Sequence, residues 1–179
     1  RLLELIYQQE KLTSQSKNLR PSVSRRLSSF QKMIITGIDN ILLGDEEALA
    51  VFRDWLEQNR GEFGFGIASG RSIDSALQIV QEQKIPMPDV FITSVGSEIY
   101  YYSDERSDLI FDKARASLIS KNWQPERIKQ VLKQFDDLEL QVDLRKYKIS
   151  YIINDYSSDK IHQIRQLLKQ QKCRCSVVV

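Results

Sequence analysis

The sequence predicts an α/β fold built on a parallel sheet, followed by a smaller α+β module. Three short apolar runs, Met33–Thr36, Phe63–Ala68 and Asp89–Val95, alternate with two stretches whose apolar residues recur at helical spacing. This strand–helix–strand–helix–strand order implies parallel strands joined by right-handed crossovers. After residue 102 the chain changes to short strands and helices that carry no chemical motif of their own, which indicates a separate module.

The two helices of the parallel part have recognisable starts. The first is expected over residues 46–59, with Asp45 as its N-cap, because an aspartate side chain accepts the free N–H groups of a first turn. The second is expected over residues 73–83, directly after the Ser-Gly-Arg-Ser turn at 69–72. Pro86 and Pro88 then break the chain before the third strand.

The second half reads as strands and helices of an α+β module. A helix is expected over residues 125–135, strands over 138–140 and 148–153, and a further helix over 159–171 with Ser158 as its cap. Cys173–Val179 is rich in β-branched residues and predicts a final strand. Because the three valines at 177–179 are followed by no turn, we expect the chain to be a piece of something longer.

The first residues are expected to lie outside the fold. Residues 1–17 carry leucines and an isoleucine among polar residues, which predicts a short amphipathic helix. Residues 14–29 are rich in Ser and Arg, a composition that favours a linker. The expected organisation is therefore residues 1–31 as a linker or the end of a preceding domain, 32–102 as the core, and 103–179 as the α+β module.

Composition places the chain among ordinary soluble proteins. Of 179 residues 41% are hydrophobic and 28% charged, and the net charge of +2 is too small to favour nucleic acid or membrane as a partner. No apolar run is long enough to span a bilayer. The two cysteines, Cys173 and Cys175, are read as reduced thiols, since His162 is the only histidine and a metal site needs more ligands. Few cysteines favour a cytoplasmic setting.

Residues suited to chemistry follow the three predicted parallel strands. They are Gly37 and Asp39 after the first strand, Ser69, Gly70 and Arg71 after the second, and Gly96, Ser97 and Glu98 after the third. Ligands of parallel sheets bind outside the carboxyl ends of the strands. A Ser-Gly turn that opens a helix suits a phosphate, and an aspartate can accept a proton or hold Mg²⁺ together with a second carboxylate.

Four motifs in order resemble the haloacid dehalogenase superfamily. They are the strings IITGIDN at 34–40, ASGRS at 68–72, SVGSEIY at 94–100 and YKISY at 147–151. Within that superfamily they are similar to the sucrose-phosphate branch, meaning sucrose-phosphate phosphatases and, more closely, the phosphatase-like C-terminal domain of sucrose-phosphate synthases. The resemblance covers about residues 32–179, and the GSEIY and KISY strings are its most specific parts.

The resemblance implies a Rossmann-like core with an α+β cap, of which the C-terminal part of the core is missing here. It also implies Mg²⁺-dependent phosphoryl transfer through an Asp-x-Asp motif whose first aspartate attacks phosphorus. Here Gly37 stands at the attacking position and Ile41 stands where the family has Thr, whereas Asp39 matches the acid/base position. No phosphoenzyme can form on a glycine, and Mg²⁺ held by Asp39 alone would be weakly bound.

The resemblance assigns the remaining positions to phosphate and sugar. Ser69 matches the hydroxyl that binds phosphate, and Gly96, Ser97, Glu98 and Lys148 match positions that contact sugar. The lysine and the acidic loop that would complete a Mg²⁺ site should lie beyond Val179. Each residue also has a structural interpretation, since Asp39 can cap a loop, Ser69 can form a tight turn and Lys148 can be an exposed cross-strand residue.

The sequence leaves three functions open. The first is a catalytically inactive phosphatase-like domain of a sucrose-phosphate synthase, whose expected partners are the glycosyltransferase region of the same parent protein and a true sucrose-phosphate phosphatase. The second is an active Mg²⁺-dependent sucrose-6-phosphate phosphatase in which Asp39 or Asp45 attacks. The third is a sensor that binds sucrose 6-phosphate through Ser69, Ser97 and Lys148.

Overall fold

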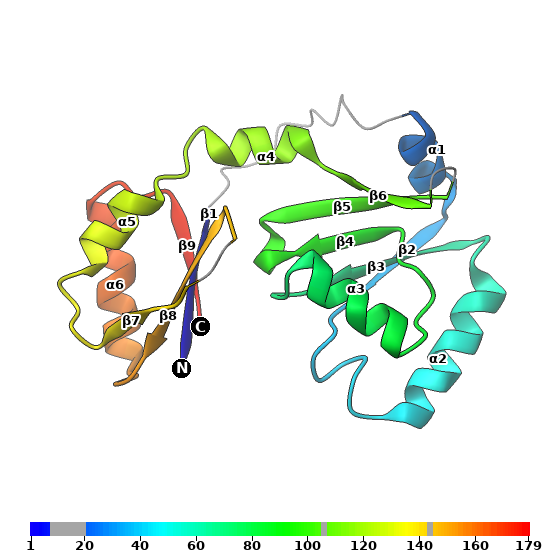
Figure 1. Ribbon diagram of the computed structural model, residues 1–179, viewed down its shortest axis with the longest axis horizontal. Coiled ribbons are helices and arrows are strands. Elements are labelled where there is room, and N and C mark those ends of the chain that lie inside the picture. Colours follow the sequence, from blue (N-terminus) through cyan, green and yellow to red (C-terminus); the bar gives the residue numbers. More distant parts are fainter. Residues whose placement is uncertain (8–20, 105–106, 143–144) are drawn as a thin grey trace. The chain divides into compact units, whose positions relative to one another are not determined.

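The chain folds into two compact units (Figure 1). The computed structural model describes residues 1–7, 21–104, 107–142 and 145–179. Unit 1 combines Arg1–Gln15 with Ala116–Val179, and unit 2 is Ser16–Arg115. The division differs from the expected boundaries at 31 and 102, because the start of the chain belongs with its end and because unit 2 extends to Arg115.

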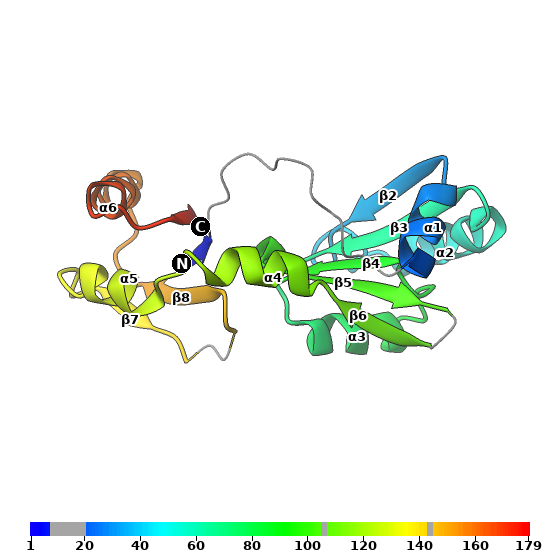
Figure 2. The ribbon, with the colours of Figure 1, turned by 90° about the horizontal axis from the view of Figure 1, so that it is seen from above.

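Unit 2 is built on a five-stranded sheet of order β2-β3-β4-β5-β6 (Figure 2). The strands β2 (Lys32–Thr36), β3 (Phe63–Ala68) and β4 (Val90–Thr93) are parallel, as the sequence predicted. The helices α2 (Glu46–Asn59) and α3 (Ile73–Glu82) join them. Their apolar residues and those of β3 and β4 form one core that includes Leu56, Phe65, Ala76 and Phe91.

The predicted helix starts are confirmed by their caps. The Ala48 N–H donates to Asp45 Oδ1 at 2.9 Å and begins α2. The Ser75 N–H donates to Ser72 Oγ at 3.3 Å and begins α3. Both helices therefore begin where the side-chain pattern indicated, at the ends of loops that leave the strands.

An antiparallel pair of strands that the sequence did not predict completes the sheet of unit 2. A short turn, η1 (Ser94–Gly96), leads directly into β5 (Glu98–Ser103), which pairs antiparallel with β4, and β6 (Asp108–Phe111) pairs with β5. Ser103 ends β5 and Asp108 begins β6, so the expected module boundary at residue 102 falls inside this pair of strands. The three consecutive tyrosines at 100–102 lie in β5 and take part in sheet packing, as their aromatic character favours.

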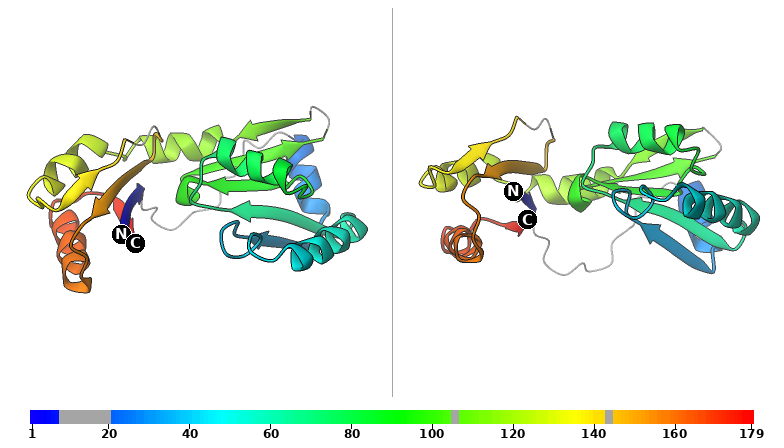
Figure 3. Two further views of the ribbon diagram at one scale, coloured as in Figure 1. Left: turned by 60° about the horizontal axis from the view of Figure 1, so that its bottom comes forward. Right: turned by 90° about the horizontal axis from the view of Figure 1, so that it is seen from below.

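Unit 1 contains a four-stranded antiparallel sheet of order β7-β8-β1-β9, with α5 (Pro125–Leu132) and α6 (Ser158–Gln170) covering one face (Figure 3). The strands β7 (Leu138–Leu140), β8 (Lys148–Ile153) and β9 (Cys175–Val178) match the predicted runs. The cap of α6 is Ser157 rather than Ser158. The helix α4 (Lys113–Ser120) crosses the boundary between the two units.

The amphipathic helix expected at the start of the chain is wrong for the residues that the structure describes. Leu2–Tyr7 forms strand β1, which lies between β8 and β9 and pairs antiparallel with both. The side chains of Leu3 and Leu5 are fully buried in the core of unit 1. The segment Pro21–Ser29, expected as linker, is the helix α1, and residues 8–20 of the expected helix and linker lie outside the described residues.

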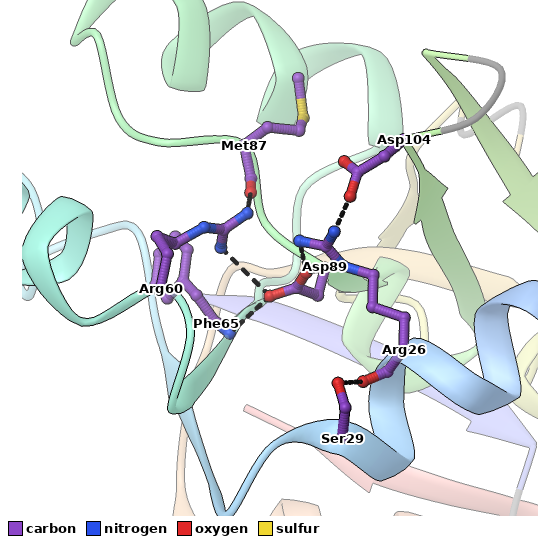
Figure 4. A network of polar contacts seen from close by, with 7 residues as sticks. All are labelled: Arg26, Ser29, Arg60, Phe65, Met87, Asp89 and Asp104. Atoms are coloured by element: carbon purple, nitrogen blue, oxygen red, sulfur yellow. Dashed lines mark hydrogen bonds and ion pairs between the residues drawn. The ribbon is translucent and has the colours of Figure 1, made fainter.

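A buried carboxylate joins α1 to the sheet of unit 2 (Figure 4). The Asp89 side chain, fully shielded from solvent, accepts hydrogen bonds from Arg26 Nε at 2.7 Å and Arg60 Nη1 at 3.1 Å. It also accepts the backbone N–H of Phe65 at 2.8 Å. Arg26 in addition pairs with Asp104. Because two guanidinium groups and a backbone N–H contact the carboxylate, this buried charge is compensated, and α1 is tied to the core.

Candidate functional site

The ends of β2, β3 and β4 lie together in unit 2 and form the candidate site. The Ser69 N–H donates to the Ile92 carbonyl at 2.8 Å, and the Val95 N–H donates to the Ser69 carbonyl at 3.2 Å. The Ser94 N–H donates to the Arg71 carbonyl at 2.9 Å. These bonds fix the turn after β3 against the turn after β4, so the predicted convergence of the second and third strand ends is present.

An ion pair joins the first strand end to the second. Arg71 Nη2 lies 2.6 Å from Asp39 Oδ1, and Arg71 Nε lies 3.0 Å from Asp39 Oδ2, so the guanidinium holds both carboxylate oxygens. The hydrogen bonds from Arg71 hold the pKa of Asp39 below its usual value of 3.8. Asp39 is therefore a carboxylate at neutral pH, in the wrong protonation state for a general acid toward a leaving oxygen.

The turn after β3 is organised by its own hydroxyl. Ser69 Oγ accepts the backbone N–H of Arg71 at 3.2 Å, and Ser72 caps α3. Arg71 Nη1 also donates to Ser75 Oγ at 3.1 Å, a contact from one turn into the helix. The Ser-Gly-Arg turn thus places a hydroxyl, backbone N–H groups and a guanidinium at the N-terminus of α3, a combination suited to a phosphate.

Gly37 lies directly after β2 at the position where a nucleophile is expected. A Cβ atom added there would approach Ile41 Cδ1 to 2.9 Å and the Ala68 carbonyl oxygen to 3.8 Å. The Ile41 side chain, 69% exposed, therefore leans over the space that a larger residue at position 37 would use. The two departures from the family pattern are therefore adjacent in space, because Ile41 occupies the volume that a side chain at position 37 would need.

The turn after β4 has an unusual backbone. Ser94, Val95 and Gly96 all have positive φ, at 51°, 57° and 81°. Left-handed backbone is costly for a β-branched residue such as Val95, and it persists only where the surroundings impose it. Ser97 Oγ donates to the Ser94 carbonyl at 2.8 Å and is buried, so its hydroxyl is engaged within the turn.

Glu98 is held at the start of β5. Ser94 Oγ donates to Glu98 Oε2 at 3.2 Å, and the Tyr100 hydroxyl approaches the same oxygen at 3.5 Å. Burial, followed by the charge of Glu98, raises the pKa of Tyr100 to about 12. Arg115 Nη2 donates to the Gly96 carbonyl at 2.9 Å. These contacts support a role for Ser97 and Glu98 in shaping the turn; their expected contact with sugar stays a prediction.

Lys148 lies in unit 1, unlike the other predicted site residues. Its side chain is 1% exposed and pairs with Glu4 of β1. The expectation of an exposed cross-strand lysine is therefore wrong. Its role as a sugar contact stays a prediction, and a ligand would have to compete with Glu4 for the ammonium group.

The described residues do not fit a bound Mg²⁺ ion. Among the residues that the structure describes, no group of three or more His, Cys, Asp or Glu side chains is placed to hold a metal. Asp39, the predicted ligand, is engaged by Arg71. Mg²⁺ takes six oxygen ligands in octahedral geometry, so a single paired carboxylate is a poor site.

Two contributors to the site were missed from the sequence. Ser75 positions Arg71 from the first turn of α3, and Ser94 positions Glu98. The spacing of four residues between each pair was the available signal, since such residues share a helix face or close a tight turn. The pairing of Asp39 with Arg71 had no local signal, because the two residues are 32 positions apart.

No helix among the described residues is both long and apolar enough to cross a membrane. The sequence matches the family described as Sucrose-6F-phosphate phosphohydrolase over residues 30–179. The match begins after β1 and α1, so these two elements lie outside the family region.

Solved structures agree with this match. The sucrose-phosphatase of Synechocystis, solved in complex with sucrose and phosphate, is 30% identical with a TM-score of 0.72 over 80% of this chain and 58% of that one. A haloacid dehalogenase-like hydrolase from Bacillus subtilis, 19% identical with a TM-score of 0.51, covers 85% of this chain and 63% of that one and shares the fold.

The curated relatives include both a sugar-phosphate phosphatase and a sucrose-phosphate synthase. Mannosylfructose-phosphate phosphatase of Agrobacterium fabrum is 25% identical over 76% of this chain and 55% of its own length. Sucrose-phosphate synthase 4 of Arabidopsis thaliana is 26% identical over 69% of this chain and 13% of its own length. The chain thus spans little more than half of the first of these relatives and a small part of the second. The mixed α/β fold, the ordered motifs and the match over residues 30–179 together show that the chain belongs to the sucrose-6F-phosphate phosphohydrolase family, within the haloacid dehalogenase superfamily.

Proposed function

We propose that this chain is a catalytically inactive, phosphatase-like domain of a sucrose-phosphate synthase, with a structural, regulatory or sucrose-6-phosphate-binding role. The observation that carries the proposal is Gly37 at the strand end where the attacking carboxylate belongs, with Ile41 packed over it. Without a nucleophile no aspartyl-phosphate forms, so phosphoryl transfer stops before its first covalent step.

The neighbouring groups favour holding a phosphate over hydrolysing it. Arg71 is a bidentate donor, and bidentate arginine contacts to phosphate are among the stronger hydrogen bonds in proteins. A bound phosphate would compete with Asp39 for this guanidinium. The site therefore supports reversible binding in which Arg71 exchanges one oxyanion partner for another.

The proposed partners follow from the relatives. The similarity to a part of sucrose-phosphate synthase 4 supports a parent protein whose glycosyltransferase region neighbours this domain. The similarity to sucrose-phosphatases supports sucrose 6-phosphate as the ligand, and a true sucrose-phosphate phosphatase as a further partner that would use it. An active Mg²⁺-dependent phosphatase is the alternative, supported by the retained Asp39 and by the phosphatases among the relatives.

The decisive experiment is a phosphate-release assay with sucrose 6-phosphate and Mg²⁺. We expect no turnover above the uncatalysed background from this chain, because position 37 has no nucleophile. Gly37→Asp, alone and together with Ile41→Thr, restores the missing side chains and serves as the rescue arm. Enzyme-like turnover by the unchanged chain, abolished by Asp39→Asn, would overturn inactivity and establish the alternative.

Calorimetry with sucrose 6-phosphate separates a binding role from a purely structural one. We expect Arg71→Ala to weaken binding by about tenfold or more, the loss expected for a charge-assisted contact. Asp39→Asn should strengthen binding, since it removes the competing carboxylate. Arg53→Ala is the matched control, because Arg53 lies in the same unit and donates to the Gln83 carbonyl. Absence of binding at millimolar ligand would leave the structural role.

A further inference from the structure

A cavity in unit 1 lies between the C-terminal part of α6 and strand β9. Its volume is about 720 Å³, within the range of small-molecule sites, and it is entirely lined by residues 165–177. The lining residues are Arg165, Leu168, Lys169, Lys172, Cys173, Arg174, Cys175, Ser176 and Val177. This cavity is separate from the strand-end site, which belongs to unit 2.

The charge around this cavity has one sign. Four of the nine lining residues are cationic and none is acidic. Within the described part of the chain, Lys169, Lys172 and Arg174 make no ion pair. Arg165 and Lys169 are four residues apart on one helix, a spacing at which like charges destabilise a helix. A bound anion would remove that repulsion.

The helix dipole explains only part of this arrangement. Cations stabilise the last turn of a helix, which accounts for Lys169 and for Lys172 just beyond the end of α6. Arg165 lies before the last turn, and Arg174 lies directly before β9. All four nevertheless face the same cavity, which a dipole effect does not require.

The floor of the cavity suits an anion with an organic body. Leu168, Cys173 and Cys175 are buried and apolar in character. Burial raises the pKa of Cys175 to about 12 and also raises the pKa of Cys173, so both thiols are neutral and do not repel an anion. Arg165 Nη2 donates to the Val177 carbonyl at 3.1 Å, which holds this guanidinium in place over β9.

We propose that this cavity binds a small organic phosphate, with Arg165, Lys169, Lys172 and Arg174 contacting the phosphate oxygens and the buried floor contacting the organic body. Arginine and lysine donors form charge-assisted hydrogen bonds to phosphate. A ligand here would stabilise the folded state of unit 1 in proportion to its occupancy. This proposal does not depend on the proposed function of the strand-end site, so a result that overturns one does not overturn the other.

Calorimetry with inorganic pyrophosphate on the full chain tests this site at constant ionic strength. We expect saturable binding that Lys169→Glu or Arg174→Glu weakens by about tenfold or more. Lys133→Glu is the matched control, because it reverses a charge in the same unit outside the cavity lining and should leave binding unchanged. An equal effect of Lys133→Glu, or an equal heat from sulfate, would overturn the proposal.

Thiol protection locates the ligand without any substitution. The chain has two cysteines, and both line this cavity. We expect pyrophosphate at saturation to slow their reaction with a maleimide several-fold, whereas sucrose 6-phosphate bound only at the strand ends would not. Binding of pyrophosphate without thiol protection would overturn the assignment to this cavity. Tighter binding of citrate than of pyrophosphate would overturn the assignment to a phosphate.

Discussion

The space above Gly37 is occupied by a side chain that can leave it. Ile41 is mostly exposed, so rotating its terminal methyl away removes little buried apolar area. Gly37 itself does not lie in the left-handed region that favours glycine. The backbone at this strand end is therefore compatible with an aspartate, and the difference from the family pattern is one of side chains rather than of main-chain geometry.

At the same scale, Asp89 is the residue on which the attachment of α1 depends. Asp89→Ala removes the acceptor of two arginines and of the buried Phe65 N–H, so we expect the free energy of unfolding to fall by roughly 3–5 kcal/mol. Urea denaturation measures the change. Arg26→Ala should cost clearly less, because Arg60 and the Phe65 N–H still compensate the carboxylate; equal losses would contradict this account.

At the scale of the element, β1 is a central strand with two different faces. Leu3 and Leu5 point into the apolar core, while Glu4 between them points to the opposite face and meets Lys148. A one-residue slip of β1 would exchange these faces and place a carboxylate in the core. The ion pair therefore specifies the register of the strand.

Removing one partner of the Glu4–Lys148 pair should lower the free energy of unfolding more than removing both partners. Glu4→Gln takes the carboxylate away from a buried ammonium, and we expect a loss of roughly 3–5 kcal/mol in unfolding free energy. Adding Lys148→Met should recover much of this loss, because the buried charge is then gone. A double-mutant cycle by chemical denaturation measures the coupling, and strictly additive losses would exclude an energetically coupled pair.

The hairpin of β5 and β6 contains Tyr101, a tyrosine whose pKa is raised. Burial, and then the neighbouring Asp112, raises the pKa of Tyr101 to about 12. Because the unfolded phenol has a pKa of about 10, stability from this group is complete below pH 10 and is lost as pH rises toward 12. Absorbance titration should show Tyr101 ionising late, and Asp112→Asn should lower its pKa toward 10. An unchanged titration in Asp112→Asn would exclude the charge as a contributor.

At the scale of the whole molecule, the two units have separate cores that draw on different parts of the chain. Unit 1 needs residues from both ends, because β1 fills the space between β8 and β9. Unit 2 is continuous in sequence. The family match begins at residue 30, so the strand that completes the sheet of unit 1 comes from outside the family region.

Deleting residues 1–7 should therefore destabilise unit 1 and leave unit 2 folded. We expect unit 1 to lose its cooperative unfolding transition, since two fully buried leucines and the Glu4 carboxylate are removed. Hydrogen exchange should show amides of 148–153 and 175–178 losing protection while those of 63–68 keep theirs. The Leu2→Ala variant, which trims an exposed side chain of the same strand, is the control. Retained protection of β8 after the deletion would contradict this account.

The sequence by itself determined the parallel strands, the two helices between them, the positions of the later strands and helices, and the three strand ends that form the candidate site. These follow from periodicity of two and 3.6 residues and from capping side chains, which are local signals. The resemblance of the four motifs to the haloacid dehalogenase superfamily added that Gly37 stands at the position of the attacking aspartate. The sequence did not predict the strands β5 and β6, because their residues lack clean alternation.

Only the tertiary structure decided the partners of side chains far apart in sequence. Leu2–Tyr7 looked helical because its leucines suit either period, and its strand form depends on β8 and β9, which lie more than 140 residues away. The tertiary structure likewise brings Arg71 to Asp39 and Lys148 to Glu4. Such contacts are set by the path of the backbone through the fold, and no local pattern encodes that path.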